Sequence, residues 1–240
     1  MPGVPKGTSL SEQNRPAAIR REACIRAGSR RVRARDAARL PGLGNPGLYA
    51  WFIDRQGAAD LSSGLGQSLS AGLIYAGQTG AGTSGATLRS RLLGNHLGGN
   101  TYGSTFRLTL ASILRGRLGL RPAGGRRMER ADEPVLTAWM LDHLSLAAFA
   151  VPDPATVDAL ETSVLGILDP PLNLAKLSAT PVRQALSALR RDFGRVGTSA
   201  PLRPKAEPAT RRASAVVGTR GALSTRGFTP EELARDLGLS

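Results

Sequence analysis

The chain has 240 residues, enough for one domain with terminal extensions or two small domains, and too many for a peptide hormone or a small disulfide knot. It carries 32 Lys and Arg against 18 Asp and Glu, and the net charge of +14 favours a polyanionic partner such as nucleic acid. The single cysteine, Cys24, excludes an intrachain disulfide and a cysteine-based zinc cluster, and two histidines exclude a multi-histidine metal site. Because no apolar stretch is long enough to span a bilayer, we expect a cytoplasmic protein without membrane contact.

The net charge divides the chain into three parts. Residues 1–44 carry a net +7 and no aromatic side chain, which is typical of a flexible basic extension. Residues 45–177 carry a net +1 and contain both tryptophans and all three tyrosines, so the hydrophobic core is expected there. Residues 178–240 carry a net +6. Between residues 89 and 128 there are eight arginines and no acid, which predicts one basic face on the core.

Residue patterns predict an alternation of short strands and helices. Aromatic and aliphatic runs predict strands over 47–53 and 72–77, and the Gly- and Ser-rich stretch 56–70 between them reads as a long hairpin connection. The later predictions, in chain order, are helices over 87–97 and 105–117 (the second N-capped by Ser104), a helix over 133–143, a strand over 144–151, and helices over 155–168 and 181–191. This order predicts an α+β fold with a small three-stranded antiparallel sheet flanked by helices, and basic flexible extensions at both ends.

These boundaries predict four segments: a basic N-terminal extension (1–44), a folded domain (45–193), a flexible linker (194–226) and a short C-terminal helix (227–240). The last segment resembles the first helix and turn of a small helix-turn-helix DNA-binding module found in bacterial nucleoid-associated proteins. Because the second, recognition helix of such a module is absent, we interpret this segment as part of a truncated module.

Five short motifs follow one another between residues 47 and 173. They are Gly47-Leu48-Tyr49, Tyr75-Ala76-Gly77, Leu88-Arg89-Ser90-Arg91-Leu92, the stretch from His96 to Arg107, and Glu161 followed by Asp169-Pro170-Pro171-Leu172-Asn173. In this order they resemble the GIY-YIG nuclease superfamily, and in particular its restriction-endonuclease-like bacterial branch, over about half of the chain. The resemblance implies a metal-dependent endonuclease that hydrolyses DNA phosphodiester bonds, of a restriction or genome-defence type.

The resemblance implies a catalytic set of Tyr49, Tyr75, Arg91, His96 and Glu161. Glu161 is the expected ligand of one Mg²⁺ or Mn²⁺ ion, because Mg²⁺ accepts a single protein carboxylate and takes its other ligands from water and substrate phosphate. A phenol has a pKa near 10, and a neighbouring arginine lowers it toward the range of a useful base while gripping the scissile phosphate. His96 is an additional base in this interpretation.

Further residues are expected to support the site or to bind DNA. Gly47 and Gly77 should allow close approach of the backbone, and Asn173 should tie the loop after the last helix of the motif to the sheet. The residues expected to contact the DNA backbone are Arg89, Arg107, Arg115, Arg117, Arg126 and Arg127.

Two departures from the family pattern leave other functions open. Gln78 stands where many members have lysine, and the usual Arg-to-His spacing would fall on Asn95, whereas His96 lies five residues after Arg91. One alternative is therefore a nucleic-acid-binding protein that retains the fold without cleavage. Another is a structural or regulatory subunit whose basic ends bind acidic protein surfaces. Because one chain carries one site, cutting both strands of double-stranded DNA would require a homodimer or two successive nicks.

Overall fold

The structure is a computed structural model that describes residues 31–196. The predicted C-terminal helix over 227–240, and the predicted linker beyond residue 196, lie outside the described residues. The elements are β1 (Val32–Arg33), the 3₁₀ helix η1 (Ala34–Arg39), β2 (Gly47–Ile53), α2 (Arg55–Leu65), β3 (Gly72–Thr79), the π-helix η2 (Ser90–Leu97), α3 (Thr105–Leu118), the 3₁₀ helix η3 (Arg130–Asp132), α4 (Glu133–His143), β4 (Leu144–Ala150), the 3₁₀ helix η4 (Pro154–Thr156), α5 (Val157–Leu168) and α6 (Pro181–Val196).

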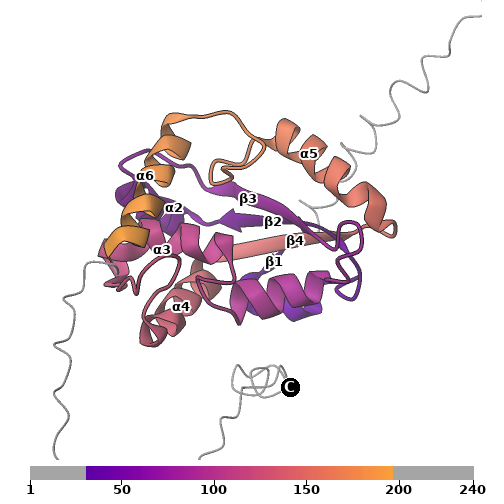
Figure 1. The fold of residues 1–240 in the computed structure, drawn as a ribbon, viewed down its shortest axis with the longest axis horizontal. Coiled ribbons are helices and arrows are strands. Elements are labelled where there is room, and N and C mark those ends of the chain that lie inside the picture. Colours follow the sequence, from indigo (N-terminus) through magenta and orange to yellow (C-terminus); the bar gives the residue numbers. More distant parts are fainter. Residues whose placement is uncertain (1–30, 197–240) are drawn as a thin grey trace, which may run out of the picture. The chain divides into compact units, whose positions relative to one another are not determined.

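The strands form one antiparallel sheet in the order β1-β4-β2-β3. Helix α5 lies on one side of this sheet, and α2, α3 and α4 lie on the other (Figure 1). Leu165 of α5 packs against Ala50 and Ala76, whereas Trp51 of β2 stacks on Phe106 of α3 at a ring-centroid distance of 5.0 Å. The alternation of side chains along β2 therefore sorts its residues between two layers.

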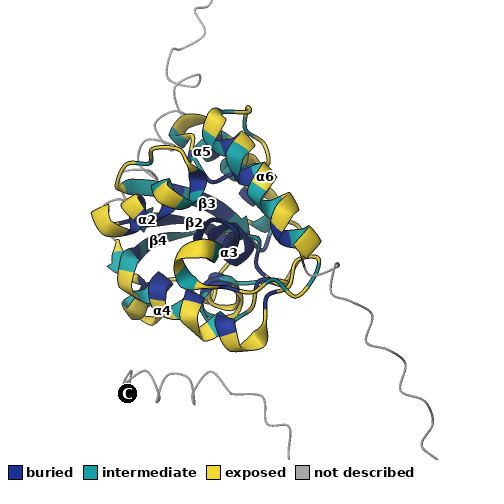
Figure 2. Ribbon diagram, turned by 90° about the vertical axis from the view of Figure 1, so that its left-hand side faces the viewer, coloured by how far each residue is buried: buried dark blue, intermediate teal, exposed yellow. Residues whose placement is uncertain are grey.

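Helix α3 is the central element of the helical layer. Most of it is enclosed by the sheet and the other helices, whereas its last turn is partly exposed (Figure 2). Every residue from Phe106 to Leu114 is buried, so the helix is surrounded on all sides rather than on one face. As predicted, Ser104 caps its N-terminus by accepting a hydrogen bond from the backbone N–H of Arg107 at 3.1 Å.

The sheet has four strands, not the three that the sequence predicted. The additional strand is β1, which pairs with β4 at its outer edge. It lies in the stretch that composition alone assigned to an N-terminal extension, yet the helix that follows it buries Ala34 and Ala37 in the core. Small alanines fill the core positions of this helix, and the buried Leu40 and Leu43 that follow are too few to give the segment an apolar pattern.

The prediction of a hairpin connection over 56–70 was also wrong, because this stretch contains helix α2. Asp54 caps the helix by accepting from the N–H of Gly57 at 2.7 Å, and Leu61 is fully buried. Its glycines and serines favour a loop locally, and tertiary burial of the apolar face overrides that preference. In the part of the chain that the structure describes, no helix is both long and apolar enough to cross a membrane.

Candidate active site

Two strand tyrosines lie on the face of the sheet that α3 covers. In the β2–β3 pairing, Tyr49 is opposite Gly77 and Trp51 is opposite Tyr75. Residues two apart on a strand share a face, so Tyr49 and Tyr75 belong to the same layer. The Tyr75 ring also contacts the ring of Phe106, with centroids 4.8 Å apart. The pairing of β2 with β3 thus brings together the two tyrosines that the sequence singled out.

Glycines make room for this arrangement. An ideal Cβ on Gly77 would lie 2.6 Å from the phenolic oxygen of Tyr49, so any larger residue would displace the phenol. An ideal Cβ on Gly47 would collide with the backbone carbonyl of Phe149 on β4. Both positions therefore require glycine because another group occupies the space of the side chain.

The phenolic oxygen of Tyr49 is the point on which the predicted site residues converge. Arg91 donates its Nε–H to this oxygen at 3.2 Å, and the imidazole Nε2 of His96 lies 2.9 Å from the same oxygen. The terminal nitrogens of Arg91 have no hydrogen-bond partner among residues 31–196. One half of this guanidinium therefore orients the phenol, while the other half is available to an anion.

A π-helix allows Arg91 and His96 to reach the same atom. In a π-helix the backbone hydrogen bonds join residues five apart, so the turn holds one residue more than an α-helical turn. The spacing of five residues between Arg91 and His96 therefore corresponds to one wide turn. His96 Nδ1 is held by Ser104 Oγ at 2.8 Å, and the backbone carbonyl of His96 accepts from Arg107 at 3.0 Å.

Burial favours the neutral form of both Tyr49 and His96. Burial raises the pKa of Tyr49 above its ordinary value, and the charge and hydrogen bond of Arg91 act in the opposite direction. Burial lowers the pKa of His96 well below its usual range, and the positive charges of Arg91 and Arg107 lower it further. A neutral His96 can accept the phenolic proton of Tyr49 through Nε2 while its Nδ1–H donates to Ser104.

Tyr75, the second phenol, lies between charges of both signs. Burial raises its pKa, the positive charges of Arg91 and Arg190 lower it, and the negative charge of Glu161 raises it. Burial lowers the pKa of Arg91, but its interactions with Tyr49, Tyr75 and Glu161, which include the hydrogen bond to Tyr49, outweigh that effect and raise it. Four of the five predicted catalytic residues thus lie on the strands and the π-helix. The fifth, Glu161 on α5, acts electrostatically on Tyr49, Tyr75 and Arg91.

Glu161 is held by a lysine that the sequence interpretation did not consider. Lys176 donates from Nζ to Glu161 Oε2 at 2.8 Å, to Asp158 Oδ1 at 2.7 Å and to Thr162 Oγ1 at 3.1 Å. The backbone of Lys176 has a φ of 64°, a left-handed conformation that non-glycine residues adopt rarely. Glu161 Oε1 has no partner among the described residues, and the side chain is 15% exposed.

Asn173 joins the loop after α5 to the outer edge of β3. Its Oδ1 accepts from the N–H of Ala76 at 3.0 Å, and its Nδ2 donates to the carbonyl of Ala76 at 2.7 Å. Leu172 extends the contact by donating its N–H to the carbonyl of Ile74 at 3.0 Å. These bonds satisfy backbone groups of an edge strand and keep the loop that carries Lys176 against the sheet.

The arginines assigned to DNA lie in different places. Arg107 is fully buried and cannot reach a DNA backbone: it pairs with Glu133 at 2.7 Å and donates to carbonyls at the end of the π-helix. Arg89 is exposed, and Arg127 lies over the ring of Tyr102 at 4.5 Å. The acid-free window from 89 to 128 is neutralised in part because acids from outside it fold back onto its arginines.

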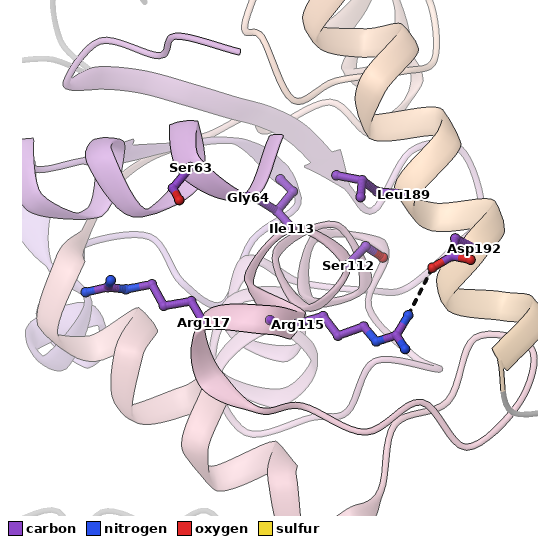
Figure 3. A pocket seen from close by; sticks show the side chains of 9 residues that line it. Ser63, Gly64, Ser112, Ile113, Arg115, Arg117, Leu189 and Asp192 are labelled. Atoms are coloured by element: carbon purple, nitrogen blue, oxygen red, sulfur yellow. Dashed lines mark hydrogen bonds and ion pairs between the residues drawn. The ribbon is translucent and has the colours of Figure 1, made fainter. Parts of the chain in front are cut away.

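Arg115 and Arg117 line a groove of about 770 Å³ between α2, α3 and α6, together with residues such as Ser63 and Leu189. Arg115 points toward α6, where it pairs with Asp192 at 3.0 Å, and Arg117 points the other way (Figure 3). Arg117 pairs with the buried Asp60 at 2.8 Å. Neither tyrosine of the site lines this groove, so these arginines and the phenols belong to separate parts of the surface.

Two residues near the site went unnoticed in the sequence. Lys176 is the only lysine between residues 45 and 193, and this isolation was the signal that could have identified it. Arg190, on helix α6, interacts electrostatically with Tyr75, and nothing in its local sequence indicates this. Gln78, opposite Leu48 in the β-pairing, belongs to the α5 side of the sheet and not to the layer of the two phenols.

A family model described as the GIY-YIG catalytic domain matches residues 47–192, well over half of the chain. The protein therefore belongs to the GIY-YIG family, in agreement with the motifs, and its domain is that of a nuclease. No curated protein and no solved structure matches the chain.

Proposed function

We propose that the protein is an endonuclease that hydrolyses DNA phosphodiester bonds at the site formed by Tyr49, Tyr75, Arg91, His96 and Glu161. The observation that carries the proposal is the convergence of Arg91 Nε and His96 Nε2 on the phenolic oxygen of Tyr49. A buried phenol between a guanidinium and a neutral imidazole can exchange a proton, because the hydrogen bonds of these two fixed groups stabilise the charge that develops on its oxygen. This arrangement suits the activation of a water molecule beside a phosphate.

In this mechanism Tyr49 accepts a proton from the attacking water and passes its own proton to His96 Nε2. Arg91 stabilises negative charge on the phenolic oxygen through Nε and binds the scissile phosphate through its terminal nitrogens. Tyr75 provides a second phenol that can hydrogen-bond the water. The neutral state of His96 is required, because a protonated imidazole could not receive the proton.

Glu161 fits a divalent ion with few protein ligands. Within residues 31–196, no three His, Cys, Asp or Glu side chains lie close enough together to hold a metal, so the ion would have at most two such ligands, of which Glu161 is the one that the family motif implies. Its Oε1 atom is without a partner, and Mg²⁺ or Mn²⁺ takes the remaining ligands from water and phosphate. Such an ion supplies positive charge that polarises water and offsets charge on the phosphate.

The proposed substrate is double-stranded DNA, in a restriction-type or defence-type reaction of a bacterial cytoplasmic protein. Because each chain carries one such site, cleavage of both strands would proceed through a homodimer or through two successive nicks. The high positive charge of the chain supports a DNA partner.

Supercoiled plasmid provides the test. With Mg²⁺ or Mn²⁺ the wild-type protein should produce nicked or linear DNA, and chelator should abolish the product. Tyr49→Phe keeps the ring and removes the oxygen, and we expect it to lower the rate by about 10²–10⁴-fold, with Glu161→Gln at least as severe. Tyr102→Phe, at an exposed tyrosine outside the site, is the matched control and should cleave normally.

The ion pair between Lys176 and Glu161 favours one alternative, a DNA-binding protein without cleavage, because the lysine already neutralises the expected metal ligand. In that case the plasmid would shift on a gel but stay intact with every divalent ion, and Glu161→Gln would change nothing. A structural role on acidic proteins would instead leave no DNA shift at low salt.

A further inference from the structure

Two arginines without an acidic partner lie near each other beside Tyr75. They are Arg126, on the loop before η3, and Arg190, on helix α6. Arg126 makes one side-chain hydrogen bond, to Thr105 Oγ1 at 3.0 Å, and Arg190 makes no hydrogen bond or ion pair with the described residues. By contrast, Arg107, Arg115, Arg117, Arg121 and Arg183 all pair with carboxylates in the same domain.

Backbone contacts fix the loop that carries Arg126. The N–H of Gly125 donates to the carbonyl of Gly194 near the end of α6, at 3.1 Å. On its other side, Arg126 reaches Thr105 at the start of α3, next to the Phe106 ring that touches Tyr75. The loop therefore bridges α6 and the N-terminus of α3 at the level of the second phenol.

Helix α6 brings Arg190 to the same place. Arg190 lies four residues before Gly194, one helical turn away, and is half-buried. The neighbouring Leu186 and Phe193 are fully buried and hold this part of α6 against the core. Burial lowers the pKa of Arg190, the positive charge of Arg126 lowers it further, and Tyr75 acts in the opposite direction.

The guanidinium groups of the half-buried Arg190 and the exposed Arg126 repel each other, and no carboxylate among residues 31–196 compensates them. Such an arrangement costs stability in the free protein and is relieved when an anion binds between the charges. Planar guanidinium groups suit phosphate, which they bind through two parallel hydrogen bonds. A phosphate of a DNA backbone also comes with neighbouring phosphates, so it can occupy this place while another lies at Arg91.

We propose that Arg126 and Arg190 form a second phosphate subsite, which binds a DNA backbone phosphate next to the one that Arg91 holds. The relation of this subsite to cleavage rests on the proposed function, whereas its affinity for phosphate does not. Both Arg91 and Arg190 act electrostatically on Tyr75, so both phosphate positions would be near this phenol. The subsite fixes the register of the strand across the phenols and carries no base information.

DNA binding in chelator, where no cleavage occurs, tests the subsite on the full-length protein. For the Arg126→Gln/Arg190→Gln variant, the slope of log Kd against log salt concentration should fall in magnitude by about 1, as expected for one lost phosphate contact. Arg55→Gln, which removes one positive charge from an exposed helix start, is the control and should keep the wild-type slope. An unchanged slope in the double variant would overturn the proposal.

Replacing one phosphate at a time by an uncharged methylphosphonate locates the contact. At one position the replacement should lower the affinity of the wild-type protein for DNA and leave the affinity of the double variant unchanged. If Tyr49→Phe cleaves normally, and the loss of affinity at that one phosphate still depends on the two arginines, the catalytic proposal fails and the subsite stands. If cleavage follows Tyr49 but no position couples to the two arginines, the subsite fails and the catalytic proposal stands.

Thermal unfolding separates binding from a structural role. Because Arg190→Gln removes a repulsion, its Tm should be equal to or higher than that of the wild type. Inorganic phosphate at constant ionic strength should raise the Tm of the wild type and not that of the double variant. A lower Tm of Arg190→Gln together with an unchanged salt slope would assign the arginine to the fold and reject the subsite.

Discussion

Arg91 and His96 lie five residues apart on one π-helix, and both contact the phenolic oxygen of Tyr49, at 3.2 and 2.9 Å. The spacing differs from the family pattern by one residue, and the wider turn absorbs that difference. Single π-turns of this kind are rare and frequently occur at functional sites. His96 therefore occupies a position suited to a proton acceptor despite its shifted place in the sequence.

The buried His96 predicts a specific dependence of stability on pH. Its folded pKa lies well below the value of about 6.5 expected in the unfolded chain. Below that value the unfolded chain takes up a proton that the folded chain refuses, so stability is complete above about pH 7 and falls as the pH drops. Urea unfolding between pH 7.5 and 5.5 should show a loss of up to about 1.4 kcal/mol per pH unit from this group.

His96→Gln should flatten this part of the profile, because the amide can replace hydrogen bonds but does not titrate. Asn95→Gln, an exchange at an exposed position of the same helix that removes no titratable group, is the control and should keep the wild-type slope. An equal slope in His96→Gln and the wild type would contradict a buried neutral imidazole.

Gly77→Ala should inactivate the site without unfolding the protein. The added methyl group would meet the phenolic oxygen of the buried Tyr49 at 2.6 Å and push it away from Arg91 and His96. We expect a loss of cleavage of about 10²-fold, as a displacement of 1 Å can cause, measured on plasmid beside near-normal circular dichroism. Gly116→Ala, at an exposed helical glycine with open space around it, should keep cleavage and raise the Tm. Similar rates for both variants would show that the phenol position is unimportant.

Sequence patterns predicted the strands and helices whose side chains repeat with a clear period. The strand that carries Tyr49 and the helix capped by Ser104 are of this kind, because their pattern arises from one buried face and one local cap. Strand β1 was missed because it is only two residues long, and helix α2 was missed because it is rich in alanine, glycine and serine; only long-range packing stabilises them there. Such contacts leave no local signal.

In the candidate site too, residues within short motifs could be predicted from the sequence, whereas contacts between distant segments could not. The motifs located the phenols, Arg91 and Glu161, since each belongs to a short pattern. The ion pair between Lys176 and Glu161, and the burial of Arg107, depend on which acids lie across from them in space. Charge counted along the sequence therefore overestimated the basic surface.

Arg107 should prove to be a folding residue. It is fully buried, and its removal leaves Glu133 as a nearly buried carboxylate without its partner. Arg107→Leu should lower the free energy of unfolding by about 3–5 kcal/mol in urea titrations. In chelator the folded fraction should keep the wild-type salt slope for DNA. A stable variant whose slope falls in magnitude by about 1 would instead return Arg107 to the DNA interface.

Removing Lys176 should strengthen divalent-ion binding. Its ammonium group contacts Glu161 Oε2, the carboxylate expected to hold the ion, so lysine and metal compete for the same negative charge. Lys176→Gln should therefore bind Ca²⁺ more tightly in calorimetry and reach half-maximal cleavage at a lower Mg²⁺ concentration. Asp158→Asn is the control, because it removes the outer partner of Lys176 and leaves Glu161 unchanged, and it should shift the affinity less. If Lys176→Gln binds Ca²⁺ no better and also loses cleavage, the lysine itself supplies the positive charge that the phosphate requires.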